Sequence, residues 1–302
     1  MSFEQRREFL FVYSVKDANP NGDPLNANHP RFDEDSSQIL VSDVRVKRTV
    51  RDQWLIEGRD VFVDGETKTL KSRVAELKEK LGVTTGKEAL SRCIDTRLFG
   101  VTFALGSESF AWTGPVQFKW GRSLHRAAVE TIQGTAAFAT KEGSEQRSFR
   151  SEYIVPFVLI SDYAIANQHA SLTTGATDED IDALFEALWK GTANLITRSK
   201  VGHMPRFLLE VRYAKGFDGI IGAMDEKVRL LGADGHSLSA DEQLALRSCD
   251  EVLLDITALS SALSRVSQDV ERVRILHEMD LKVRGIEELK ALLGGKLALE
   301  AR

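Results

Sequence analysis

The chain has 302 residues, of which 42% are hydrophobic and 28% charged, a composition typical of a soluble globular protein with a sizeable core. Its net charge of −5 argues against a protein that coats nucleic acid without selection. No apolar run approaches the length of a membrane span, the polar start is no secretory signal, and the two cysteines, Cys93 and Cys249, are far apart, so the sequence predicts a reduced cytoplasmic protein.

The first predicted element is Glu8–Val15, an aromatic and β-branched run typical of a strand. It is followed by DANPNGDP (residues 17–24), which cannot continue a helix or a central strand because proline lacks an amide donor and fixes its own φ. Four of its residues match the first half of a calcium loop, D-x-[DN]-x-[DN]-G, but the twelfth position is Asn28 and not the bidentate glutamate. We therefore predict a shaped turn without a metal ion.

Helical patterns follow the loop. Ser42 is a favourable N-cap for a helix that ends at Gly58, with Val46, Val50 and Trp54 as its buried stripe. Residues 60–65 suggest a short strand, and residues 67–82 and 87–100 each read as a helix, so a helical insertion is expected at about 64–105.

The next segments alternate between strand and helix patterns. Residues 109–121 and 153–165 are β-rich, and the polar stretch 133–152 between them predicts a projecting hairpin or loop. Residues 177–196 form a helix capped by Thr177, and Arg206–Ala214 is a strand. Without the insertion and the projecting segment, the order strand, helix, strand, strand, helix, strand predicts an α+β, ferredoxin-like antiparallel sheet over residues 1–216.

Residues 217–302 change in character. They hold 11 Lys and Arg against 16 Asp and Glu, which accounts for the whole net charge. The stretch 241–279 reads as a long helix, in which Leu259, Leu263 and Val266 begin a 4,3,4,3 apolar spacing. We therefore expect residues 217–302 to be a helical extension packed on the preceding domain.

No catalytic or metal-binding motif is evident. The six histidines show no HExxH or His–Cys spacing, and there is no GxSxG or Walker sequence. The acidic run Asp33–Asp35 is read most simply as a solvated loop. The sequence therefore requires neither an enzyme nor a cofactor.

Basic residues are better organised. Lys47, Arg48 and Arg51 fall within about 100° of one another on the first helix. A second set lies in TRSKVGHMPR, residues 197–206. Each set alone is typical of solvated charge, but the inferred topology brings both to the edge that carries the loop 17–24. Together they indicate a surface for phosphates and nucleotide sugars. The projecting segment adds Lys141, Arg147 and Arg150, with Phe149 between the last two as a stacking group or a buried anchor.

Four blocks, NPNGDP, HPR, VSDVRVKRTVRD and LWKGTANLITRSKVGHMPR, together resemble the backbone subunit of type I CRISPR Cascade complexes, most closely the type I-B (Csh-type) branch. The match covers most of residues 8–216. The resemblance implies an RNA-recognition-motif-like palm with a helical insertion and a thumb-like hairpin. Copies would stack head to tail along one CRISPR RNA, with other Cascade subunits, and present its spacer to target DNA. It implies a cytoplasmic, non-catalytic ribonucleoprotein component without a cofactor or membrane contact.

The resemblance also implies an RNA path. Carried over by matching position, its residues are Asn19, Asn21, Arg31, Arg45, Lys47, Arg48, Arg51, Arg198, Lys200, His203 and Arg206. Arg147 and Arg150 are added from the position of the projecting segment alone. Two alternatives stay open. Backbone subunits of type III complexes cut RNA with an aspartate in a comparable loop, which would make Asp23 the centre of a metal-dependent endoribonuclease. The chain would otherwise be a stand-alone single-stranded RNA-binding protein.

Overall fold

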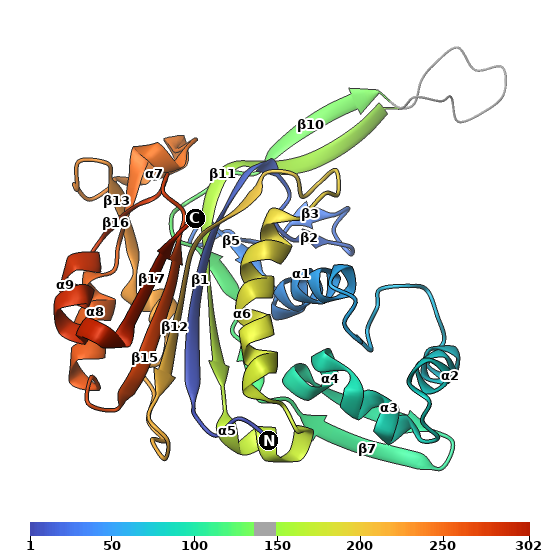
Figure 1. Ribbon diagram of the computed structural model, residues 1–302. Coiled ribbons are helices and arrows are strands. Elements are labelled where there is room, and N and C mark those ends of the chain that lie inside the picture. Colours follow the sequence, from blue (N-terminus) through green and yellow to red (C-terminus); the bar gives the residue numbers. More distant parts are fainter. Residues whose placement is uncertain (136–148) are drawn as a thin grey trace, which may run out of the picture.

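The computed structural model describes residues 1–135 and 149–302 (Figure 1). Its main feature is a large, mostly antiparallel sheet, and the expected mixture of helices and strands is confirmed. In spatial order its strands are β17 (Leu297–Ala301), β15 (Val270–His277), β12 (His203–Tyr213), β1 (Arg7–Ala18), β11 (Phe149–Ala166), β9 (Gly121–Ser123), β5 (Gln38–Val41) and β4 (Phe32–Asp33). Two further strands, β8 (Val116–Phe118) and β10 (Glu130–Thr135), also pair with β11.

The centre of the sheet is β1, which pairs antiparallel with both β11 and β12. Its run FLFVYSV is buried on both faces, since Phe9, Phe11 and Tyr13 enter one core and Leu10 and Val12 the other. A strand covered on both sides reads as a continuous apolar run, which is why the sequence identified it.

One face of the sheet is covered by α1 (Asp43–Ile56) and α6 (Asp178–Ala193), and the short α5 (Gln168–Thr174) lies between β11 and α6 in the chain (Figure 1). The predicted stripe of α1 is confirmed, because Val46, Val50 and Trp54 are all buried in this core. Thr177 closes a capping box with Asp180 at the start of α6, as expected from the Thr-x-x-Asp spacing.

An insertion between α1 and β8 has a core of its own. It comprises α2 (Leu70–Leu81), α3 (Gly86–Arg92), α4 (Ile94–Phe99), β6 (Gly100–Leu105) and β7 (Glu108–Thr113). The prediction of one helix over 87–100 is wrong, because Cys93 is extended at φ −79° and ψ 126° and divides it into α3 and α4. The insertion is also not purely helical, since β6 pairs with β7. The rings of Phe103 and Phe110, one from each strand, pack with their centroids 5.0 Å apart.

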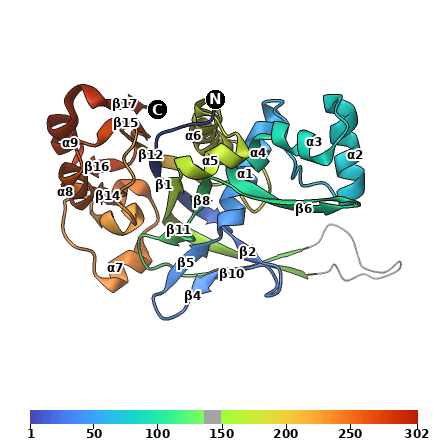
Figure 2. The ribbon, with the colours of Figure 1, turned by 90° about the horizontal axis from the view of Figure 1, so that it is seen from below.

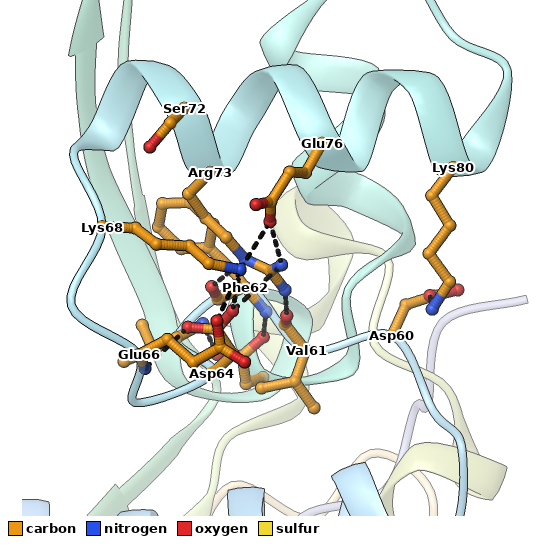
Figure 3. Close-up of polar contacts among 12 residues, drawn as sticks. Asp60, Val61, Phe62, Asp64, Glu66, Lys68, Ser72, Arg73, Glu76 and Lys80 are labelled. Atoms are coloured by element: carbon orange, nitrogen blue, oxygen red, sulfur yellow. Dashed lines mark hydrogen bonds and ion pairs between the residues drawn. The ribbon is translucent and has the colours of Figure 1, made fainter.

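The charged side of α2 is tied to the loop that enters it (Figure 3). Arg73 donates to the Phe62 carbonyl at 3.0 Å and pairs with Asp64 at 3.0 Å. Lys68 lies between Asp64 at 3.3 Å and Glu76 at 2.8 Å, and these carboxylates raise its pKa. The expected short strand at 60–65 is absent from this described loop, because side-chain contacts rather than a ladder hold its backbone.

The opposite face of the sheet is covered by the C-terminal residues. Their elements, besides β15 and β17, are η1 (Met224–Lys227), β13 (Arg229–Gly232), α7 (Ala240–Ala245), η2 (Cys249–Glu251), β14 (Val252–Asp255), α8 (Thr257–Arg265), β16 (Lys282–Arg284), α9 (Ile286–Leu293) and η3 (Gly294–Lys296). Figure 2 shows this layer and the insertion on opposite sides of α6.

The long helix expected over 241–279 is wrong. Leu259 and Leu263 do lie in a helix, α8, but Val270 and Val273 belong to β15, which extends the main sheet beside β12. All four enter the same core, so pairing with β12 overrides an apolar spacing that also suits a helix. The C-terminal region is therefore mixed rather than helical.

Two short features stand near the end of β1. The loop after β1 folds into the small hairpin β2 (Gly22–Asp23) and β3 (His29–Pro30). The paired β10 and the start of β11 project from the body (Figure 1), and most of the segment 133–152, for which a projection is expected, lies outside the described residues. Within the described ranges, no helix is both long and apolar enough to cross a bilayer.

Candidate nucleic-acid interface

Two loops that are far apart in the sequence meet at the end of β1. The backbone N–H of Asn19 donates to the Ser199 carbonyl at 3.0 Å, and that of Lys16 donates to the Gly202 carbonyl at 3.1 Å. Gly202 has φ +106°, and a Cβ there would lie 2.2 Å from the Lys16 carbonyl oxygen. Only glycine allows this approach. The motif blocks NPNGDP and RSKVGHMPR therefore form one structural unit.

Lys200 fastens the unit from the inside. Its Nζ donates to the carbonyl of Pro20 at 3.2 Å and also to that of Asn19. Burial, and secondarily the charge of Arg45, lower the pKa of Lys200 to about 7. Because its donors are directed at the loop backbone, Lys200 shapes the loop rather than projecting from it.

The two asparagines of the loop are also turned inward. Asn19 is 2% exposed, and its Nδ2 donates to the Asn28 carbonyl at 2.8 Å. Asn21 Oδ1 accepts from the backbone N–H of Ser42 at 2.8 Å and from its hydroxyl at 3.0 Å. Asn21 thus connects the loop to the start of α1. Both side chains therefore help to hold the loop in place, and their contact with RNA stays a prediction.

His203 and Arg45 lie beneath the loop. His203 is 4% exposed, stacks on Tyr13 with ring centroids 6.1 Å apart, and contacts the Lys200 carbonyl through Nδ1 at 2.8 Å. Burial and the neighbouring charges of Lys200 and Arg45 lower the pKa of His203 to about 3. Arg45 donates to the Thr49 hydroxyl at 2.7 Å, and burial lowers its pKa. Neither ring nor guanidinium is freely exposed.

A groove of about 500 Å³ opens beside this unit. Its walls are the loop after β1, the loop that precedes β12 and the base of the β10–β11 pair, through Asp17, Asn28, Ile132, Glu152, Tyr153, Thr197, Arg198 and Ser199 among others. The His29 and Tyr153 rings lie 4.9 Å apart at its edge. Arg198 is its exposed cation, with 64% of its side chain accessible, and it pairs with Glu152 at 3.0 Å. The groove thus combines aromatic, amide and cationic groups.

The basic residues of α1 are held by carboxylates. Lys47 pairs with Asp43 at 3.0 Å, and the Arg51 Nε donates to Asp95 at 2.8 Å. Arg48 pairs with Asp52 and donates to the Asp64 carbonyl at 3.0 Å. The prediction that Lys47 and Arg51 stand exposed on the helix flank is wrong: their side chains are only 10% and 14% accessible, because they close the joint between α1 and the insertion.

Arg31 and Arg206 lie away from the groove. Arg206 donates from Nε to the Ser14 hydroxyl at 2.9 Å and pairs with Glu278, on the face covered by the C-terminal residues. Arg31 lies 5.8 Å from the centroid of the Trp120 ring and 3.5 Å from Asp23. Of the predicted set, the structure therefore places Arg198 on the groove and separates Arg31 and Arg206 from it.

The projecting segment is described only in part. Lys141 and Arg147 lie outside the described residues. Phe149 and Arg150 belong to β11, where Arg150 pairs with Gly134 of β10. Their strand runs directly into the groove wall at Glu152 and Tyr153.

Asp23 shows no metal site. Its Oδ1 accepts from the Leu25 backbone N–H at 3.1 Å and pairs with Arg31 at 3.5 Å. Across residues 1–135 and 149–302, no group of three or more His, Cys, Asp or Glu side chains is arranged to hold a metal ion.

Sequence reasoning missed Glu152 and Tyr153 as groove residues, and His29 at the edge of the groove. The fact that Tyr153 opens a β-rich run beside a projecting segment was the available signal, because residues at the base of an arm face the body. For Glu152 no sequence signal existed, since its position depends on the pairing of β11.

Comparisons with known proteins identify the family and the fold of the chain. A family model described as "CRISPR-associated protein Cas7" matches residues 5–229. A Haloferax volcanii protein of the same description is 28% identical over 319 residues, which covers 94% of this chain and 90% of that protein. A chain of a "CRISPR RNA-guided surveillance complex, pre-nicking" is similar with a TM-score of 0.59 and 15% identity, covering 98% of this chain and 96% of that chain. A chain of a "CRISPR RNA-guided surveillance complex" has a TM-score of 0.51 and 17% identity, covering 90% and 88%. At these identities the two structures show a shared fold.

Proposed function

Because this chain belongs to the Cas7 family of CRISPR-associated proteins, we propose that it is a non-catalytic, RNA-binding backbone subunit of a CRISPR RNA-guided complex. The observation that carries the proposal is the groove at the end of β1. Its walls are built from the blocks NPNGDP and RSKVGHMPR, together with the base of the projecting β10–β11 pair. Cationic, aromatic and amide groups in one groove suit a single-stranded RNA.

The sheet supports a ferredoxin-like palm as part of this proposal. The strand order β12-β1-β11-β9 places the first strand between the third and the fourth, and α1 and α6 pack on one face. We keep residues 1–216 as the palm and 217–302 as a C-terminal extension, now one of mixed structure that covers the other face. We take the β10–β11 pair to be the base of the thumb.

The RNA site divides into contacting and supporting residues. We assign contact to Arg198 and Tyr153 on the groove and to His29 beside Tyr153 at its edge. From the sequence alone, we also assign contact to Arg147 and Arg150 of the projecting segment. Arg31 extends the path beyond the β2–β3 hairpin, since 30% of its side chain is accessible. The residues that support the loops of the groove are Asn19, Asn21, Arg45, Lys200 and His203. Lys47, Arg48 and Arg51 support the joint between α1 and the insertion, and Arg206 supports the face covered by the C-terminal residues.

The assembly that we propose follows from RNA held by its backbone. Several copies of this chain would lie head to tail on one CRISPR RNA, with other Cascade subunits, and leave the spacer bases free to pair with target DNA. The four sequence blocks favour a type I-B-like complex. We place it in the cytoplasm, where CRISPR RNA and target DNA meet in a prokaryotic cell.

A binding and cleavage assay tests this function. The protein, titrated with single-stranded RNA of CRISPR repeat and spacer sequence, should bind with an affinity that falls with added salt, as phosphate contacts require. Binding that is absent, or insensitive to salt, would contradict the proposal. Incubating the assembled complex with complementary RNA and Mg²⁺ tests the non-catalytic part. Cleavage at regular spacing that is lost in Asp23→Ala would assign an endoribonuclease instead.

A further inference from the structure

One ion pair spans the proposed RNA groove. Arg198 Nη2 lies 3.0 Å from Glu152 Oε1, and the two residues come from different walls. Arg198 belongs to the loop that precedes β12, and Glu152 belongs to β11, where it pairs with Ile132 of β10. Both residues line the groove. The exposed cation of the groove is therefore engaged by a carboxylate when no RNA is bound.

The carboxylate is unexpected in a groove for a polyanion. At 29% accessibility, the Glu152 side chain is half-buried, whereas Arg198 is 64% accessible. A phosphate that approaches Arg198 is repelled by the negative charge of Glu152, and the two anions compete for the same guanidinium. An ion pair that is this accessible contributes little to stability, so it exchanges readily for a phosphate.

We propose that Glu152 is a placeholder for an RNA phosphate: it occupies Arg198 in the RNA-free protein and is displaced when single-stranded RNA enters. The inference rests on the proposed function. Displacement has two consequences. It reduces the favourable free energy of binding by a fixed amount. An RNA strand with many phosphate contacts still binds, whereas a single anion does not. Displacement also removes one contact between the loop before β12 and the base of the β10–β11 pair.

Glu152→Gln is the direct test, because it keeps the shape of the side chain and removes the charge. Single-stranded RNA should bind Glu152→Gln more tightly than the unaltered protein, by about fivefold, the equivalent of an exposed ion pair. The matched control is Glu186→Gln on α6. Glu186 pairs with Lys190 at 3.3 Å and lies outside the groove. Glu186→Gln changes the net charge by the same amount as Glu152→Gln. Its RNA affinity should stay near that of the unaltered protein.

A second background separates displacement from simple repulsion. In Arg198→Gln the placeholder has no cation to occupy, so adding Glu152→Gln should give a clearly smaller gain than it gives alone. Equal gains in both backgrounds, or equal gains from Glu152→Gln and Glu186→Gln, would overturn the inference while leaving RNA binding intact. If neither the unaltered protein nor any variant binds RNA, the proposed function fails instead.

An RNA-free measurement supports the same distinction. Phenylglyoxal modifies exposed guanidinium groups, and mass spectrometry of peptides locates the modified arginines. Arg198 should react faster in Glu152→Gln than in the unaltered protein, while its rate in Glu186→Gln should not change. An unchanged rate in Glu152→Gln would show that the pair does not protect Arg198 and would overturn the inference.

Discussion

Arg51 donates from Nε to Asp95 at 2.8 Å, and Asp95 is fully buried. The same carboxylate accepts the backbone N–H groups of Phe62 at 2.7 Å and Val63 at 3.1 Å. One buried carboxylate thus joins α1, the loop that leaves it and the start of α4. Arg51, expected from the sequence to meet RNA, closes this joint.

Arg51→Met should therefore destabilise the fold. It leaves the buried Asp95 with backbone partners only, and breaking one side of a buried ion pair costs about 3–5 kcal/mol. Urea unfolding followed by circular dichroism measures the change. The matched control is Arg59→Met, because Arg59 is 44% accessible and pairs at 3.3 Å with Glu57 on the surface. If Arg51→Met is as stable as the control but binds RNA less well, Arg51 contacts RNA and does not act through Asp95.

Arg198→Gln should have the opposite profile. Its side chain is exposed, so the free energy of unfolding, measured in urea, should change by less than about 0.5 kcal/mol. RNA binding should weaken. The slope of the logarithm of the binding constant against the logarithm of salt concentration should decrease in magnitude by about one unit, as expected for the loss of one phosphate contact. Lys190→Gln on α6 is the control for charge, since Lys190 does not line the groove. A salt slope that is the same in Arg198→Gln and in the unaltered protein would remove Arg198 from the site.

Gly202→Ala tests whether the two motif blocks form one unit. The variant would have to accept φ +106° and a Cβ 2.2 Å from the Lys16 carbonyl oxygen. Gly216→Ala is the matched control, because Gly216 has φ +87° but no atom within 4 Å of the added Cβ. The control should lose about 1 kcal/mol of stability from its backbone conformation, whereas Gly202→Ala should lose more and also bind RNA less well. Equal losses in the two variants would contradict the close approach.

His203 predicts a dependence of stability on pH. Its pKa is lowered to about 3 in the folded protein, from the ordinary value of 6.5. The unfolded chain therefore binds a proton first as the pH falls, and the stabilisation, fully present above pH 6.5, is lost progressively toward pH 3. Between pH 7 and pH 5 the loss from this group is about 2 kcal/mol.

His203→Asn removes this titration and keeps a donor for the Lys200 carbonyl. The drop in unfolding free energy between pH 7 and pH 5, measured in urea, should be smaller in His203→Asn than in the unaltered protein. Groups remote from His203, such as the buried His125, titrate alike in both proteins and cancel in the comparison. An identical drop would mean that His203 is not buried in its neutral form.

The central strands and the two helices over the sheet were predictable because their signals are local. Thr177 and Asp180 form a capping box within four residues, and the stripe of α1 repeats on one helix face. The C-terminal region was not predictable in this way. The spacing of Val270 and Val273 suits a helix as well as a strand, and only the pairing of β15 with β12 decides between them.

The site was predictable as a place but not as a set of side chains. The two motif blocks do meet at the end of β1, through Lys200 and Gly202. Whether a basic residue is free, however, depends on carboxylates that are distant in the sequence. Asp95 lies 44 residues from Arg51, and Glu278 lies 72 residues from Arg206. Such partners are brought together by tertiary structure alone, which local patterns do not encode.

The central claim is that several copies of this chain share one RNA. Native mass spectrometry of the protein, purified from a host that carries its CRISPR locus, tests this most directly, because it gives the mass of the intact particle and of the RNA released from it. We predict a particle that contains multiple copies of the 302-residue chain and one RNA of defined length. A monomer free of RNA, or a single copy on RNA of random length, would contradict the account.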